Sequence, residues 1–122
     1  MSIFYQIWHR PLMTINGEHV ISAVIRLCGG RNVFADLPAL AGEVGLEAVL
    51  AADPEAIVAS DVPEQDRPGW LDHWQQWPRL QAVRNGHLFR IDPDLIQRHS
   101  PRILEGAERM CERLEQVRRN RE

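Results

Sequence analysis

Residues 87–111, HLFRIDPDLIQRHSPRILEGAERMC, decide the fold, because they predict a strand, a loop and a helix in that order. The strand ends before Pro93, since proline cannot donate a ladder hydrogen bond. Ser100 suits an N-cap and Pro101 the first helical position. Ligands of open α/β sheets lie outside the carboxyl ends of the strands, so we expect residues 94–98 to carry the function.

The rest of the chain alternates between the two kinds of element. We expect strands at residues 3–8, 56–59, 80–83 and 88–91, with a short edge strand at 32–34. We expect helices at residues 17–28, 45–52, 70–78 and 101–118, the first capped by Asn16 and ended by Gly29 and Gly30. Residues 9–15 and 35–44 are predicted loops, and Asn85-Gly86 is a predicted turn. The alternation predicts a three-layer α/β fold with a mostly parallel central sheet.

Composition narrows the function classes. The length of 122 residues suits one domain, and the net charge of −3 argues against a nucleic-acid partner. No apolar run approaches the roughly 18 residues of a membrane-spanning helix, so stable membrane insertion is not expected. No signal peptide is visible ahead of the first predicted strand. The chain is therefore either cytosolic or a piece of a longer, exported protein.

The motifs of common enzymes are missing from the sequence. It has no G-x-S-x-G, P-loop or H-E-x-x-H pattern, so we expect no catalytic residues and no cofactor. His9 and His99 fall on loops at one predicted sheet edge, where imidazole rings can act as metal ligands. Loop histidines are more often solvated or hydrogen-bonded, and we predict no metal site.

Several residues allow two interpretations. Trp70, Trp74 and Trp77 have helical spacing, which favours a face packed on the sheet over a ligand platform. Trp8 ends the first predicted strand, a position from which a side chain can face a cleft, and the sequence leaves open whether it does. Asp94 and Arg98 either pair with each other or contact a ligand. Glu47 lies in the first turn of its predicted helix, where the helix dipole alone explains a carboxylate. Cys28 and Cys111 are either two buried free thiols or a bonded pair.

Several blocks of sequence, in order, resemble one known family. They are residues 4–6, Pro11, Thr14, Glu18, CGGRNVF at 28–34, EAVLAADPEAIV at 47–58, AVRNG at 82–86 and the segment 94–103. Together they are similar to the carboxy-terminal lobe of periplasmic substrate-binding proteins of ABC transporters, of the cobalamin-binding type. In that family two Rossmann-like α/β lobes are joined by one long helix. The resemblance covers essentially the whole chain, residues 1–122, and implies that the amino-terminal lobe and the joining helix are absent from it.

The resemblance implies roles for individual residues. Asp94, Leu95, Ile96, Gln97 and Arg98 would contact the corrin ligand. Aromatic residues of the family are replaced at Leu95 and Ile96 and within residues 41–43, and we infer that Trp8 takes their place. Glu47 matches a glutamate that docks on arginines of the transporter, where charge steers encounter. Cys28 and Cys111 match a disulfide-bonded pair, which fits an oxidising periplasm.

The function implied is ligand capture without catalysis. The partners would be the missing lobe, a small-molecule ligand and the permease of an ABC importer, with the parent protein in the periplasm. A first alternative is a siderophore or haem binder on the same scaffold, which Arg10, Arg98 and His99 leave open. A second is a cytosolic flavodoxin-like domain, which would need a phosphate-binding loop after the first strand and would be favoured by free thiols at both cysteines. Residues 9–15 contain no glycine.

Overall fold

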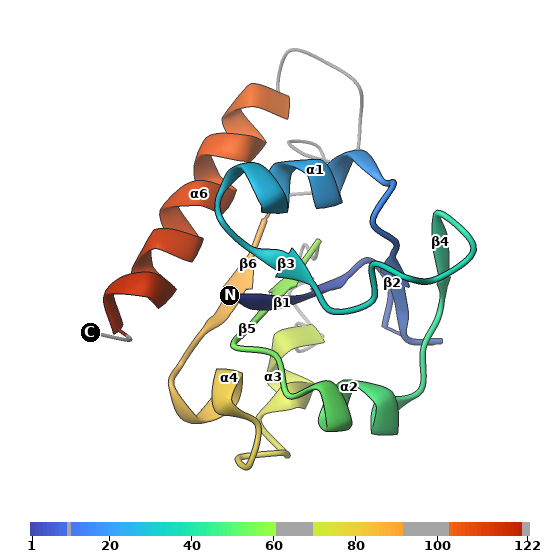
Figure 1. Ribbon diagram of the computed structural model, residues 1–122. Helices are drawn as coiled ribbons and strands as arrows, with labels where there is room; N and C mark the ends of the chain where they lie inside the picture. Colours follow the sequence, from blue (N-terminus) through green and yellow to red (C-terminus); the bar gives the residue numbers. More distant parts are fainter. Residues whose placement is uncertain (10, 61–69, 92–102, 121–122) are drawn as a thin grey trace, which may run out of the picture.

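Four parallel strands form the centre of the molecule (Figure 1). The computed structural model describes residues 1–9, 11–60, 70–91 and 103–120. The sheet has the order β3-β1-β5-β6. Its strands are β1 (Ser2–Gln6), β3 (Arg31–Asn32), β5 (Ala56–Ala59) and β6 (Leu88–Arg90).

Helices cover both faces of this sheet. On one face α1 (Val20–Leu27) and α6 (Ile103–Asn120) pack on Ile3, Tyr5 and Val58. On the other face α2 (Leu46–Ala52), α3 (Trp70–Trp74) and α4 (Gln81–Arg84) pack on Phe4 and Ile57. The alternation along β1 and β5 follows from the two-residue period of a strand. The predicted three-layer α/β fold with a parallel sheet is confirmed.

A two-stranded ribbon lies beside the main sheet and corrects the prediction of two loops. Its strands β2 (Met13–Ile15) and β4 (Ala41–Glu43) run antiparallel. The Thr14 hydroxyl donates to the Tyr5 carbonyl oxygen at 2.6 Å, which ties the ribbon to β1. Strands of three residues, one of them Ala-Gly-Glu, carry too little β-forming pattern for the sequence to indicate them.

The first helix begins later than the prediction. Its N-cap is His19, whose Nδ1 accepts a hydrogen bond from the Ile21 N–H at 3.1 Å. Asn16 caps a turn instead, because its side-chain oxygen accepts from the Glu18 N–H at 2.9 Å. Gly29, at φ 87°, ends the helix as expected.

The strand predicted at residues 80–83 is wrong, since this segment forms the short helix α4. β5 and β6 are parallel neighbours, so the chain between them must cross over, and its described part does so through α3 and α4. Asp53 holds the start of α4 through a hydrogen bond from the Gln81 N–H at 2.9 Å. Gly86, at φ 72°, still makes the turn into β6. The first strand and the α3 segment also end earlier than predicted, at Gln6 and Trp74.

Candidate functional site

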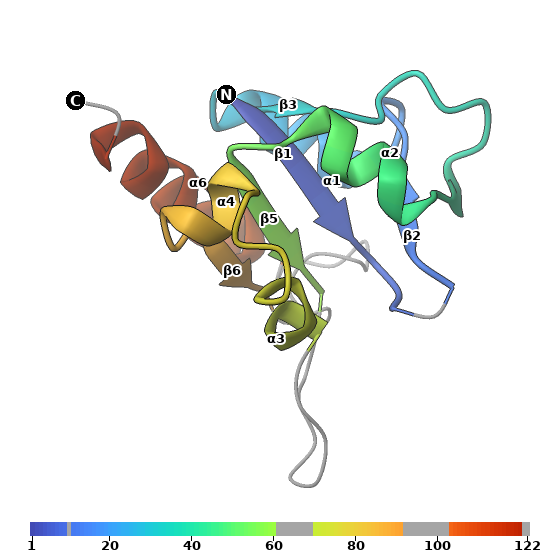
Figure 2. The ribbon, with the colours of Figure 1, turned by 90° about the horizontal axis from the view of Figure 1, so that it is seen from below.

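The carboxyl ends of β1, β5 and β6 point toward one edge of the molecule (Figure 2). The turn between β1 and β2 carries Trp8 and His9 at this edge, and α3 lies next to it. Gln6, the last residue of β1, is fully buried, and its Oε1 accepts from Trp74 Nε1 at 2.8 Å. The buried glutamine therefore fixes α3 against the end of the strand.

Trp8 is the predicted site residue that the structure describes at this edge. Its side chain is 53% exposed, and its ring meets Trp70 edge to face at 5.9 Å and 72°. An exposed tryptophan at the carboxyl end of a central strand is available to a ligand. Its role as a cleft residue stays a prediction.

A histidine pair next to Trp8 was missed by sequence reasoning. The rings of His9 and His73 lie 4.3 Å apart, and His9 is also stacked on Trp70 at 6.4 Å. His73 lies within the helix for which the sequence analysis considered only Trp70, Trp74 and Trp77. In the structure these three tryptophans do not share one packed face. Trp74 is buried under the sheet, whereas Trp70 faces the β1–β2 turn and Trp77 lies beyond the end of α3.

A hollow of about 290 Å³ opens beside the histidine pair. Its walls come from the β1–β2 turn, the start of α2, and α3 with the residues that follow. They are His9, Leu12, Leu46, His73, Trp74, Gln76 and Trp77. The lining is mostly aromatic and apolar, as in sites that hold flat organic groups.

Tyr5 and Ser60 form a buried polar contact at the ends of β1 and β5. Their hydroxyls share a hydrogen bond, and both residues are almost inaccessible to solvent. Burial raises the pKa of Tyr5 well above its usual range, while the hydrogen bond from Ser60 opposes that shift. The tyrosine stays neutral and belongs to the core on the α1–α6 side of the sheet.

The predicted ligand loop lies outside the described residues. This applies to Asp94, Leu95, Ile96, Gln97 and Arg98, and also to Arg10, His99, Ser100 and Pro101. The described ends of that segment are Ile91, at the end of β6, and Ile103, at the start of α6. Its contribution to ligand binding remains a prediction.

Glu47 lies in the first turn of α2 with its side chain exposed. None of the described residues forms an ion pair with it. The surrounding sequence is acidic, because residues 32–60 contain five Asp or Glu and no Arg or Lys. Leu46, its neighbour, lines the hollow. The arrangement leaves a carboxylate free to meet a cation.

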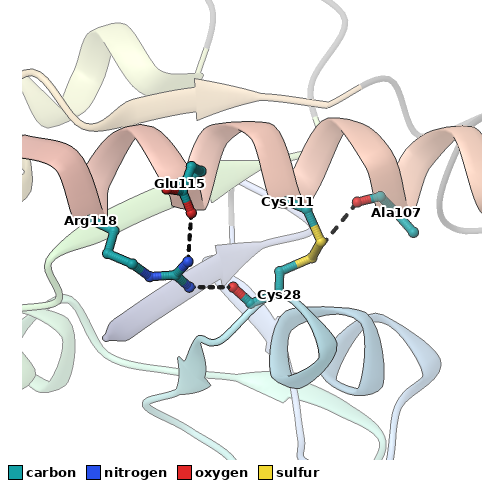
Figure 3. Close-up of a disulfide and its surroundings, with 5 residues drawn as sticks. All are labelled: Cys28, Ala107, Cys111, Glu115 and Arg118. Atoms are coloured by element: carbon teal, nitrogen blue, oxygen red, sulfur yellow. Dashed lines mark hydrogen bonds and ion pairs between the residues drawn. A yellow bond between two sulfur atoms is a disulfide. The ribbon is translucent and has the colours of Figure 1, made fainter.

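A disulfide joins Cys28 to Cys111 on the opposite face of the sheet (Figure 3). Their Cα atoms are 4.7 Å apart, within the normal range for such a bond. Arg118 donates to the Cys28 carbonyl oxygen at 2.9 Å and pairs with Glu115. The pairing implied by the family resemblance is confirmed, and the alternative of two free thiols is wrong.

The described residues lack two features. They hold no group of three or more His, Cys, Asp or Glu side chains placed to bind a metal ion. Within the same residues, no helix is both long and apolar enough to cross a membrane.

Comparisons with known proteins bear on the whole chain. It is 36% identical to the vitamin B12-binding protein of Vibrio parahaemolyticus over 119 residues, which are 97% of this chain and 42% of that protein. It superposes on the periplasmic vitamin B12-binding protein of Vibrio cholerae with a TM-score of 0.83 at 30% identity, covering 97% of this chain and 45% of that one.

A more distant structure shares the fold alone. The periplasmic haem-binding protein of Vibrio cholerae superposes with a TM-score of 0.75 at 17% identity, over 93% of this chain and 46% of that one. No family model matches the sequence. The chain spans less than half the length of the relatives it matches. It is homologous to a part of vitamin B12-binding proteins and has the fold of one solute-binding lobe.

Proposed function

We propose that this chain is the carboxy-terminal lobe of a two-lobed binding protein that captures cobalamin or a related corrinoid for an ABC importer. The observation that carries the proposal is 36% identity to a vitamin B12-binding protein over 97% of the chain. The 0.83 TM-score to a second such protein supports the same ligand class. The match to 42% of the relative is consistent with one lobe of two.

The ligand would lie at the carboxyl edge of the sheet, in a cleft closed by the other lobe. Trp8 supports this placement, because it is exposed and lies two residues beyond the end of β1. The loop from Asp94 to Arg98 would complete the contacts from this lobe. Indole rings suit a corrinoid, whose large faces carry much apolar surface.

The lobe would take no part in chemistry and would deliver its ligand to a permease. The relatives are binding proteins by name, and we infer the same for this chain, with no cofactor of its own. Glu47 would dock on a basic residue of the permease, because it is exposed and forms no ion pair among the described residues. A periplasmic location suits the disulfide.

An iron chelate is the second candidate ligand. The segment Ala41–Glu43 forms β4 without any aromatic side chain at the position where corrinoid binders of the family carry one. A haem-binding protein shares the fold. The cytosolic flavodoxin-like alternative is disfavoured, because free thiols at Cys28 and Cys111 would have supported it and the two cysteines are bonded.

Binding is tested with a chimaera and with the lobe alone. In the chimaera this chain replaces the matching 42% of the Vibrio parahaemolyticus relative. Calorimetry with hydroxocobalamin should give micromolar or tighter binding to the chimaera and far weaker binding to the lobe. NMR of the lobe alone should show the Trp8 indole signal moving as the corrinoid is added.

The controls separate folding from function. The unmodified relative reports that the assay works, and an intact Cys28–Cys111 bond with a cooperative melt reports that the chimaera is folded. A folded chimaera without corrinoid binding, together with a lobe whose Trp8 signal stays fixed, would overturn the proposal. Binding of haemin by the same samples would then support the iron-chelate alternative.

Docking is tested by reversing one charge. Glu47→Arg in the chimaera should weaken its association with the reconstituted permease of the relative's importer by about tenfold or more, as expected for loss of an interfacial ion pair. Asp36→Arg is the matched control, because Asp36 is also exposed and lies in the same acidic stretch but outside α2. Corrinoid binding should be unchanged in both variants. If both variants weaken association with the permease equally, Glu47 contributes only to the overall negative charge of this surface and is not a specific docking residue.

A further inference from the structure

Aromatic rings form an unbroken path from the exposed sheet edge into the hollow. Trp8 meets Trp70 at 5.9 Å, Trp70 is stacked on His9 at 6.4 Å, and His9 lies 4.3 Å from His73. The path begins at a ring that is 53% exposed and ends at a ring in the wall of the hollow. The rings come from two separate elements, the β1–β2 turn and α3, so no single helix periodicity produces them.

The size and walls of the hollow limit what it can hold. Its volume of about 290 Å³ is at the lower end of pockets that hold a whole small molecule. A corrinoid macrocycle is larger than this, but one flat bicyclic ring is not. Two imidazoles and two indoles, from His9, His73, Trp74 and Trp77, offer ring faces and edges for such a group.

Building on the proposed function, we propose that this hollow binds the planar aromatic base that cobalamin carries and cobinamide lacks. The macrocycle would lie against Trp8 at the sheet edge, and the base would reach past Trp70 to His73. Aromatic contacts would thus come from the β1–β2 turn and α3, and would replace those missing at Leu95, Ile96 and residues 41–43. The hollow makes the lobe selective for complete cobalamin.

The first test uses the free base as a probe, because it needs no second lobe. Added to the 122-residue chain, 5,6-dimethylbenzimidazole should move the ring signals of His73 and Trp77 in NMR spectra, with an affinity in roughly the millimolar range expected of a fragment. Cobinamide should move the Trp8 signal and leave His73 and Trp77 unchanged. A base that leaves both hollow residues unmoved would overturn the subsite.

The second test measures selectivity in the chimaera. Wild type should bind cobalamin more tightly than cobinamide, and His73→Ala should reduce that ratio by about tenfold through the cobalamin affinity alone. Gln76→Trp should do the same by filling the mouth of the hollow. Gln75→Trp is its matched control, because Gln75 is exposed on the same turn but does not line the hollow.

The outcomes separate this inference from the function on which it rests. Equal affinity of wild type for the two corrinoids, or a ratio that neither His73→Ala nor Gln76→Trp changes, would overturn the base subsite and leave corrinoid capture standing. Absence of binding to either corrinoid would overturn the proposed function instead. The free-base titration would still report independently whether the hollow accepts a flat heteroaromatic ring.

Discussion

The two faces of the sheet are built in different ways. On the α1–α6 face, the 18-residue helix α6 lays Met110, Leu114 and Val117 on the sheet and is bonded to α1 through Cys28 and Cys111. On the α2–α4 face, three helices of seven, five and four residues share the cover with large aromatic rings. The docking candidate Glu47 and the hollow beside His73 belong to this second face.

This difference separates stability from adaptability. A long helix with a covalent bond confines the first face to one arrangement. Short helices gain little from their own hydrogen bonds, so the second face depends on side-chain packing around Trp74. The hollow beside His73 is lined by residues of this second face. We expect perturbations of the first face to change global stability and those of the second to change the site.

Removing the disulfide should produce the largest change in stability. The cysteines are 83 residues apart, and in the chain-entropy model a loop of this size contributes about 4.5 kcal/mol to the free energy of unfolding. Replacing Cys28 and Cys111 together by Ala should lower that free energy by a similar amount, measured by urea denaturation. Reductant should destabilise wild type and leave the double variant unchanged. A loss below about 1 kcal/mol would show that non-covalent packing already confines α6.

On the opposite face the expected effect is smaller and has a different origin. Trp74→Phe removes the donor to Gln6 Oε1 and leaves that buried oxygen without its hydrogen bond, at a cost of about 1–3 kcal/mol. Trp77→Phe is the matched control on a half-exposed ring and should cost about 0.5 kcal/mol or less.

A double-mutant cycle identifies the hydrogen bond as the cause. Adding Gln6→Leu to Trp74→Phe should recover part of the loss, because the oxygen that needs a partner is then gone. Strictly additive losses in urea denaturation would show that the cost comes from packing volume alone.

The main sheet and its long helix could be predicted from the sequence, because the clearest apolar patterns of the chain belong to them. The strand expected at residues 56–59 is β5 without change, and the helix expected at residues 101–118 is α6, Ile103–Asn120. The strand expected at residues 80–83 is a helix because Asn85-Gly86 suits the end of a short helix as well as a turn between two strands.

The site was less predictable because it depends on contacts between elements. The indole of Trp74 meets Gln6 across 68 residues of sequence, and His9 meets His73 across a similar span. No spacing rule reaches that far. The family resemblance supplied the disulfide and Glu47, whereas the ring path required coordinates.

Two glycines with positive φ, one on each face, allow the faces to be compared through the addition of a single methyl group. Gly86 ends α4 at φ 72° with open space where a Cβ would stand, so Gly86→Ala should cost only the conformational penalty of about 1 kcal/mol. Gly29 ends α1 at φ 87°, and a Cβ there would collide with the Arg118 guanidinium, which donates to the Cys28 carbonyl oxygen. Gly29→Ala should therefore cost more than Gly86→Ala in urea denaturation.

The excess should disappear in an Arg118→Ala background, because nothing else is found within 4 Å of the new methyl group at position 29. If the two glycine substitutions cost the same in wild type, Arg118 rotates away freely and adds nothing to the confinement of α6. If the excess persists without Arg118, the junction between α1 and the disulfide is itself intolerant of a side chain. Loss of the excess in the Arg118→Ala background would identify the Arg118 contact as a source of rigidity on the first face. Either of the other two results would leave the Cys28–Cys111 bond as the main constraint on that face.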